Sequence, residues 1–64
     1  AFLTPKESEV LNLLASGLPN KRIAATMNLS SETIKWHMKK LFIKLNAGNR
    51  QHAVDRARLL GLIP

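Results

Sequence analysis

The sequence of 64 residues contains no cysteine. The chain can therefore form no disulfide, no thiolate zinc site and no cysteine nucleophile. Its two histidines, His37 and His52, stand far apart without an acidic cluster nearby, so the sequence predicts no structural metal. A domain this short buries only about 60% of the surface that its unfolded chain exposes, which leaves helix packing or a partner to stabilise it.

Long apolar runs are also absent. No segment approaches the roughly 18 apolar residues that cross a bilayer, and no signal-peptide pattern opens the chain. Paired carboxylates, an activated nucleophile and a phosphate-binding glycine loop are missing too, which argues against an enzyme and against a cofactor. With 45% hydrophobic and 22% charged residues the composition is globular. We expect one domain over residues 1–64, in the cytoplasm and without membrane contact.

Acidic residues are scarce. Ten Lys/Arg face four Asp/Glu, which gives a net charge of +6. The excess lies in the middle of the chain, because residues 20–50 hold seven Lys/Arg and only Glu32 as an acid. A basic segment on a small domain suggests a polyanionic partner, most often nucleic acid. The alternative is an ordinary solubilising surface.

Strand signals are nearly absent, whereas helix signals are frequent. Thr4-Pro5-Lys6-Glu7 has the form of a capping box with proline at the first helical position. Ser30 and Asn49 stand where N-caps are expected, and Gly17 and Gly61 where helices end. The sequence predicts an all-α fold of four helices, at about residues 5–16, 20–27, 31–45 and 49–60.

Helical periodicity divides each predicted helix into two faces. The first helix has an apolar stripe of Val10, Leu11, Leu13 and Leu14, the second Ile23, Ala24 and Met27, and the third Ile34, Met38, Leu41 and Leu45 with Phe42 beside them. The last has Ala53, Val54, Ala57 and Leu60, and Leu62-Ile63 should fold back onto the core. The far side of the third helix carries Lys35, Trp36, Lys39, Lys40 and Ile43.

The second and third helices are separated only by Asn28-Leu29-Ser30, which predicts a helix-turn-helix unit. In such units the second helix lies in the DNA major groove while the first crosses the backbone. Helix pairs with short turns are common, so the stronger evidence is the lysine-rich outer face of the third helix.

Three segments resemble the LuxR/FixJ-type (GerE-like) DNA-binding domain of bacterial transcription regulators. Leu3–Leu11 resembles the family's L-T-x-R-E-x-E-V-L opening, Gly17–Ala24 its G-x-S-N-K-E-I-A segment, and Leu29–Met38 its I-S-x-x-T-V-K-x-H-V segment. Asn49-Arg50, Ala53-Val54 and Gly61-Leu62-Ile63 extend the match along the chain. The tail from Asn49 to Leu62 is most similar to the large MalT-type regulators.

The resemblance implies the C-terminal output domain of a bacterial transcription regulator, which binds a specific sequence of double-stranded DNA. In such regulators a separate N-terminal domain controls the output domain, and the present chain looks like the output domain alone. RNA polymerase is a further candidate partner.

The chain departs from the family pattern in two ways. Pro19 and Arg22 stand where family members usually have Ser and Glu, so the capping box of the second helix is lost. An absent N-cap costs typically about 1 kcal/mol, and we expect this helix to begin loosely. The other departure is Trp36, a bulky aromatic at a variable position that faces DNA in the family.

The resemblance also assigns candidate DNA contacts. Lys35 and Lys39 match positions that reach into the groove, and Trp36 is expected against a thymine methyl or a sugar edge. Phosphate contacts are expected from Thr33, Asn20, Lys21, Arg22, Arg50, Lys40 and Lys44, and phosphate is the second interpretation for His37. Each candidate has an ordinary structural alternative: a solvated lysine, a first-turn hydroxyl, a packed histidine, for Trp36 an exposed side chain without a function, or for Arg50 an acid within the fold.

Leu59 projects away from the apolar stripe of the last helix, and in this family the last helix is the dimer contact. We therefore expect a small isologous patch of Leu59, Asp55, Arg58 and Gln51. Because the patch is small, the homodimer should be weak and should form on DNA.

Two other interpretations compete with this one. A sigma-factor-like promoter-recognition domain has a similar helix-turn-helix, although the Gly17–Ala24 and Thr33–His37 segments favour the LuxR type. The basic face could instead bind an acidic protein, in which case the domain would shift no DNA duplex.

Overall fold

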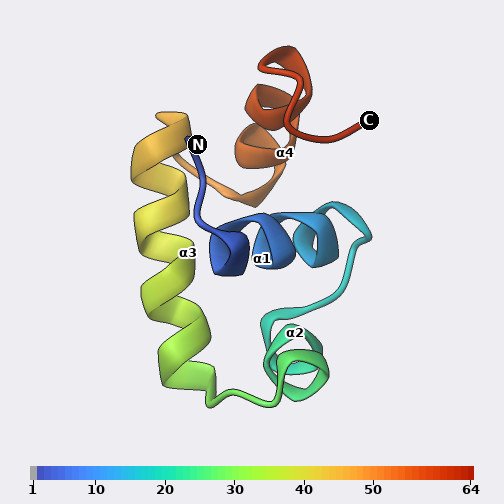
Figure 1. Cartoon of the computed structure of the whole chain (residues 1–64), viewed down its shortest axis with the longest axis vertical. Helices are drawn as coiled ribbons and strands as arrows, with labels where there is room; N and C mark the ends of the chain where they lie inside the picture. Colours follow the sequence, from blue (N-terminus) through green and yellow to red (C-terminus); the bar gives the residue numbers. More distant parts are fainter. Residues whose placement is uncertain (1) are drawn as a thin grey trace.

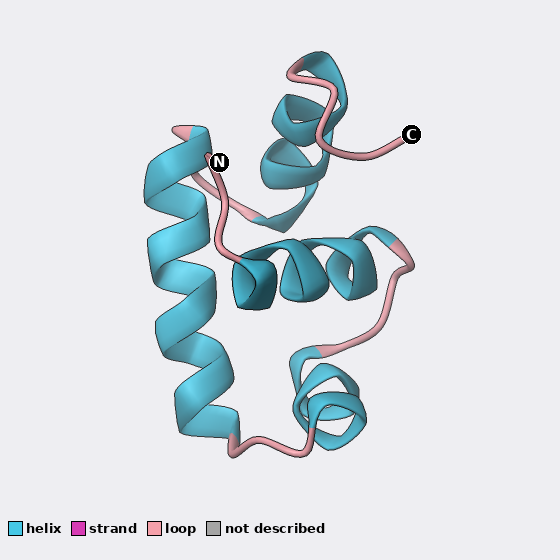
Figure 2. Ribbon diagram, in the orientation of Figure 1, coloured by secondary structure: helices cyan, strands magenta, loops and turns pink. Residues whose placement is uncertain are grey.

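The computed structural model describes residues 2–64 and contains four helices in that range. They are α1 (Pro5–Ala15), α2 (Asn20–Met27), α3 (Ser31–Leu45) and α4 (Arg50–Leu59). Each lies within one residue of the range predicted from the sequence. The prediction of an all-α, four-helix fold is therefore confirmed (Figure 2).

Three of the helices begin at side chains that cap them. The Glu7 amide donates to Thr4 Oγ1 at 3.2 Å while the Thr4 amide donates to Glu7 Oε1 at 2.9 Å, so the predicted capping box is present. Ser30 Oγ accepts from the Thr33 amide at 3.1 Å, and Asn49 Oδ1 accepts from the His52 amide at 2.9 Å. These bonds satisfy amides that the helix itself leaves without acceptors.

The start of α2 differs from the other three. Pro19 occupies the N-cap position and makes no side-chain hydrogen bond, which confirms that the cap is absent. Arg22 places a positive charge in the first turn, where the helix dipole disfavours it. The local bonds at this end are backbone bonds, from the Arg22 and Ile23 amides to the Pro19 carbonyl at 2.9 and 3.0 Å.

Left-handed backbone ends two of the helices at asparagine. Asn28 follows α2 with φ of 57°, and Asn46 follows α3 with φ of 55°. Asparagine tolerates this region better than most residues because its short side chain can bond locally. The turn of the helix-turn-helix thus begins at a residue suited to it.

Helix α3 forms one side of the molecule, and the other three helices pack against it (Figure 1). α1 crosses its middle, α2 lies at its N-terminal end and α4 at its C-terminal end (Figure 1). α1 contacts α2 and α4 as well, so it forms the centre of the domain. The side of α3 away from these helices keeps Lys35, Trp36, Lys39 and Ile43 exposed.

A single hydrophobic core joins the four helices. Its fully buried side chains come mainly from the predicted stripes, among them Leu11, Leu14, Ile23, Ile34, Leu41 and Leu45. Phe42 is half-buried at its edge, and Ile63 returns to the core as expected. Leu13 is only half-buried.

Leu60 was wrongly predicted to be a core residue, since half of its surface is exposed. α4 ends at Leu59, and the chain then turns at Gly61 in left-handed backbone with φ of 73°. The turn brings Ile63, rather than Leu60, to the core. Leu59 and Leu60 are both exposed, which widens the apolar surface at this end of α4.

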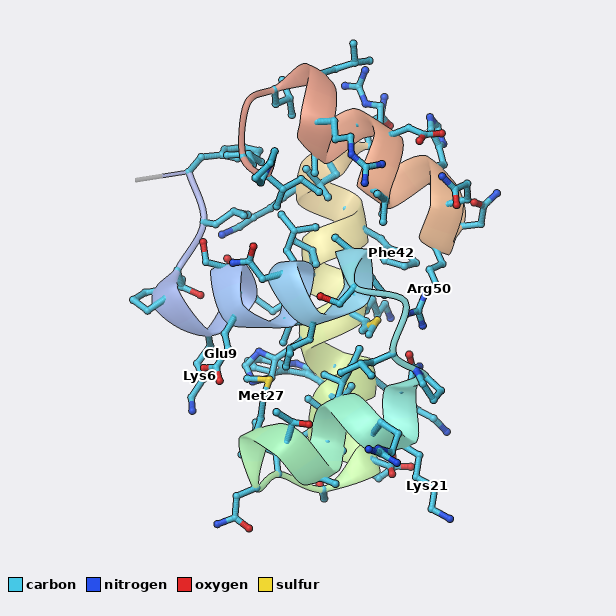
Figure 3. The ribbon with its side chains drawn as sticks, turned by 90° about the vertical axis from the view of Figure 1, so that its right-hand side faces the viewer. Lys6, Glu9, Lys21, Met27, Phe42 and Arg50 are labelled. Carbon is cyan, nitrogen blue, oxygen red and sulfur yellow. The ribbon has the colours of Figure 1, made fainter. Side chains whose placement is uncertain are left out.

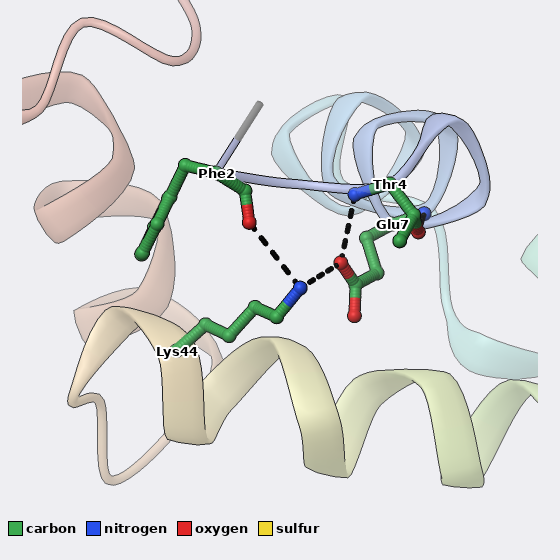
Figure 4. Close-up of polar contacts among 4 residues, drawn as sticks. All are labelled: Phe2, Thr4, Glu7 and Lys44. Atoms are coloured by element: carbon green, nitrogen blue, oxygen red, sulfur yellow. Dashed lines mark hydrogen bonds and ion pairs between the residues drawn. The ribbon is translucent and has the colours of Figure 1, made fainter.

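Glu7 is buried, which the sequence analysis did not predict. Its side chain is 1% exposed, and Oε1 accepts from Lys44 Nζ at 2.6 Å as well as from the Thr4 amide (Figure 4). Lys44 also donates to the Phe2 carbonyl at 3.2 Å. The Lys44 ammonium, followed by the Thr4 amide, lowers the pKa of Glu7 despite its burial. This ion pair ties the start of α1 to the last turn of α3.

Candidate nucleic-acid interface

The first three turns of α3 present a basic face to solvent. Lys35 and Lys39 are exposed and lie one turn apart. Neither side chain forms a hydrogen bond or an ion pair with any other residue in the range 2–64. Ile34, Met38 and Leu41 on the opposite side are buried in the core. The core therefore fixes the rotation of α3 and aims the two lysines outward.

Trp36 lies on the same face and is 56% exposed. Lys40 Nζ lies 4.4 Å from the centroid of the Trp36 ring, within the range of a cation–π contact. The His37 ring meets it edge-on, with centroids 5.0 Å apart and planes at 63°. The Lys40 ammonium, expected at a phosphate, thus lies over an aromatic ring in this structure. The spacing of four residues between Trp36 and Lys40 was the signal for this contact in the sequence.

The N-terminal end of α2 lies beside α3 and adds polar groups to the basic face. Asn20, Lys21 and Arg22 are exposed, and Lys21 extends away from the body of the domain (Figure 3). Thr33 lies in the first turn of α3, half-buried, with its hydroxyl 2.8 Å from Ser30 Oγ. His37 is half-buried too, and its Nδ1 is enclosed without a hydrogen-bond partner among the described residues.

A groove of about 350 Å³ joins α2 to α3 and to the start of α4. Its floor is apolar, made by Leu14, Met38 and Phe42, and its rim is formed by Asn20, Lys35, Lys39 and Arg50. Four of the predicted DNA contacts therefore meet around one depression, although three separate helices supply them. A second depression, of about 420 Å³, lies beyond Lys39, against Ile43 and Ala47.

Arg50 lines this groove but is held by the fold. It extends from the start of α4 toward the loop after α1 (Figure 3), and its Nη2 donates to the carbonyls of Leu14, at 3.1 Å, and of Leu18. The sequence left an acid as the alternative partner, whereas the actual acceptors are carbonyl oxygens near the end of α1. The Leu14 carbonyl lies in the last turn of α1, at the negative end of the helix dipole, and suits a guanidinium.

Three further cations are bonded within the domain. Lys44 pairs with Glu7, Arg56 Nε donates to the Leu45 carbonyl at 2.9 Å, and Arg58 Nε donates to the Pro64 carbonyl at 3.0 Å. Lys44 was a candidate phosphate contact in the sequence analysis, and the structure instead gives it a partner in α1. The basic side chains with no such partner among residues 2–64 include Lys21, Arg22, Lys35 and Lys39.

The outer face of α4 carries the residues expected at a dimer contact. Leu59 is 79% exposed, and Gln51 Nε2 donates to Asp55 Oδ1 at 3.0 Å one turn along the helix. Arg58 is exposed near the C-terminal residues. This face lies at the end of the domain away from α2 (Figure 1).

Among residues 2–64, no helix has the length and the apolar character needed to cross a membrane. Nor do three or more His, Asp or Glu side chains gather there in a way that would hold a metal ion.

The fold and the basic face of α3 define a helix-turn-helix domain. Residues 1–57 match the family described as bacterial regulatory proteins, luxR family. The chain belongs to this family, and it is a DNA-binding domain of the kind found in transcription regulators. The resemblance noted in the sequence is thus confirmed.

Relatives of known name support the assignment. The chain is 43% identical over 61 residues to the HTH-type transcriptional regulator AlkS of Alcanivorax borkumensis, a match that covers 95% of the chain and 7% of AlkS. It is 43% identical over 58 residues to the HTH-type transcriptional regulator MalT of Vibrio cholerae, covering 91% of the chain and 6% of MalT. The nitrate/nitrite response regulator protein NarP of Escherichia coli is 48% identical over 50 residues, which are 78% of the chain and 23% of NarP.

A solved structure has the same fold. The response regulator ChrA of a heme-sensing two-component system superimposes with a TM-score of 0.93 at 38% identity, over 95% of the chain and 30% of ChrA. The chain thus spans a small part of the length of each of these relatives.

Proposed function

We propose that the domain binds a specific sequence of double-stranded DNA, with α3 in the major groove, as the C-terminal output domain of a longer cytoplasmic transcription regulator. It has no enzymatic role in this proposal. The observation that carries it is the contrast among the basic side chains. Those of Lys44, Arg50, Arg56 and Arg58 bond to atoms of the domain, whereas those of Lys21, Arg22, Lys35 and Lys39 bond to no other residue that the structure describes.

Each side chain has a role that follows from its position. Lys35 and Lys39, exposed on α3, are placed to donate to guanine N7 and O6 in the groove. Asn20, Lys21 and Arg22 lie at the exposed N-terminal end of α2, where backbone amides and positive charge favour phosphate. Thr33 and His37 border this region and would each form one hydrogen bond to the DNA backbone. Arg50, whose Nη2 donates to carbonyls of the domain, would reach a phosphate only through its remaining N–H groups.

Two copies of the domain would meet through α4. The exposed Leu59 offers an apolar centre, and Gln51, Asp55 and Arg58 surround it with polar groups. A twofold dimer would bind a pseudo-palindrome whose half-site centres are about 10–10.5 bp apart. RNA polymerase would then be a partner of the assembled regulator on DNA.

Selection of bound sequences from random duplex DNA tests the proposal. We expect a short conserved half site, with guanine at the positions that Lys35 and Lys39 contact. No enrichment, together with no electrophoretic shift on any duplex at low salt, would contradict it. Tight binding to an acidic protein under the same conditions would favour the protein-interaction alternative.

A further inference from the structure

Trp36 is the only tryptophan of the chain, and it lies outside the hydrophobic core. More than half of its surface is exposed, beside the exposed lysines Lys35 and Lys39. No contact with the core explains a large aromatic ring at this position. The surface that surrounds it is the one proposed above to enter the major groove.

The ring is held in place by its neighbours. The Lys40 ammonium lies over one face, 4.4 Å from the ring centroid, and the half-buried His37 meets the ring edge-on at 5.0 Å. A cation over the ring face and an edge-on aromatic neighbour are both attractive arrangements. Trp36 therefore projects a fixed apolar surface, and less side-chain freedom is lost when that surface is covered.

The base edges of the major groove offer one apolar group, the C5-methyl of thymine. Guanine, adenine and cytosine present donors and acceptors there, which the carbon edge of an indole does not satisfy. Lysine ammonium groups suit those acceptors, and Lys35 and Lys39 already supply them. An aromatic surface beside two lysines on the same helix face therefore complements a thymine next to guanine.

We propose that Trp36 determines specificity by packing on the C5-methyl of a thymine, and that Lys40 is a positioning residue that holds the indole ring. The proposal rests on the function proposed above. It gives Lys40 a role distinct from the phosphate contact expected from the sequence, because the ammonium acts through the ring.

Replacing thymine by uracil isolates the methyl group. Uracil pairs with adenine identically and keeps the O4 acceptor, so only the methyl is lost. In the selected duplex, each thymine in turn is replaced by uracil and the affinity of the domain is measured. We expect one position in each half site to lose about fourfold, as when one methyl leaves an apolar contact. At that position 5-methylcytosine should bind more tightly than cytosine.

Variants assign the effect to the two residues. Trp36→Ala should bind thymine and uracil duplexes equally, and Lys40→Gln should reduce the ratio between them. Lys40→Arg, which keeps a cation over the ring, should restore that ratio. Lys21→Ala is the matched control, which should weaken both duplexes by the same factor. Circular dichroism checks that each variant is folded. If Trp36→Ala does not fold, Trp36→Phe takes its place, because it keeps an aromatic ring at this position.

The possible results separate the two proposals. If wild type binds a selected duplex but no uracil substitution weakens it, Trp36 reads no methyl and this inference is overturned while DNA binding stands. If the uracil effect persists in Trp36→Ala and Trp36→Phe unchanged, another residue reads the methyl. An unchanged ratio in Lys40→Gln overturns the positioning role. A domain that binds no duplex at all contradicts the proposed function itself.

Discussion

The two ends of α3 carry lysines of the same charge in opposite surroundings. In the N-terminal part, Lys35 and Lys39 extend into solvent and bond to no other described residue. In the last turn, Lys44 is 32% exposed and its ammonium lies 2.6 Å from a carboxylate of α1. A net charge therefore does not describe a binding surface: the positions of the counter-charges decide which cations remain for a partner.

Removing the Glu7 carboxylate should remove the neutralisation of Lys44 at the C-terminal end of α3. Glu7→Ala leaves the Thr4 amide without its acceptor and Lys44 without its counter-charge, and we expect a loss of about 2–3 kcal/mol in the free energy of unfolding. This is a large part of the stability of so small a domain. Urea unfolding measures it. Glu9→Ala, an exposed change on the same helix, is the control and should stay within about 0.5 kcal/mol. An equal effect of the two variants would show that the ion pair contributes nothing.

The same pair predicts an acid dependence. The Lys44 ammonium and the Thr4 amide hold the pKa of Glu7 below its ordinary value in the folded state. Since the unfolded carboxyl titrates near 4.3, the contribution of the charged form is complete above that pH and is lost as the pH falls through the lower folded value. The difference in unfolding free energy between wild type and Glu7→Gln should therefore be constant near neutrality and shrink below about pH 4. A difference that does not vary with pH would contradict this assignment.

Changes to the exposed lysines in the N-terminal part of α3 should affect DNA binding and leave the free energy of unfolding unchanged. Lys35→Ala or Lys39→Ala should cost roughly 1–3 kcal/mol in binding to the selected site and relax the base preference at one position. Arg22→Ala should weaken all sequences about equally, because phosphate contacts carry no sequence information. Binding to the selected site and to variants with one base changed measures both effects. Unaltered base preferences in Lys35→Ala would reduce its role to positioning the backbone.

The outer face of α4 allows a third comparison, between one copy of the domain and two. Because Leu59 is 79% exposed, Leu59→Asp should leave the free energy of unfolding within about 0.5 kcal/mol of wild type. In a dimer formed through α4, Leu59→Asp would bury a carboxylate in the contact, so we expect cooperative binding to a full site to disappear. Isotherms on half and full sites measure this, and half-site affinity is the internal control. Equal cooperativity in both proteins would place the contact elsewhere.

The smallest expected effect is on the salt dependence. For B-DNA, log K falls with log salt by about 0.9 for each phosphate neutralised. Lys21→Ala should reduce the steepness of that slope by about this amount. Arg56→Ala should leave it unchanged, since Arg56 bonds to the Leu45 carbonyl within the domain. Titrations from low to moderate salt test the pair of variants, and an equal change in both slopes would mean that the bonded arginines also reach DNA.

The positions of the helices could be predicted from the sequence, because the signals that begin and end them are local. Thr4 and Glu7, Ser30 and Thr33, and Asn49 and His52 are each three residues apart, so their bonds form within a single helical turn. The apolar periodicity of α3 likewise fixed which residues face outward. Leu60 was placed wrongly because its burial depends on where the chain turns after α4.

Which cations are neutralised depends on how the helices pack in the tertiary structure. Lys44 and Glu7 are 37 residues apart in the sequence, and Arg50 and Leu14 are 36 apart. No local pattern marks such pairs, since they exist only when α1, α3 and α4 have packed together. The groove lined by Asn20, Lys35, Lys39 and Arg50 likewise exists only because the helices have packed together. The sequence supplied the cations and the helix that carries them, whereas packing selected the ones that remain free to meet a partner.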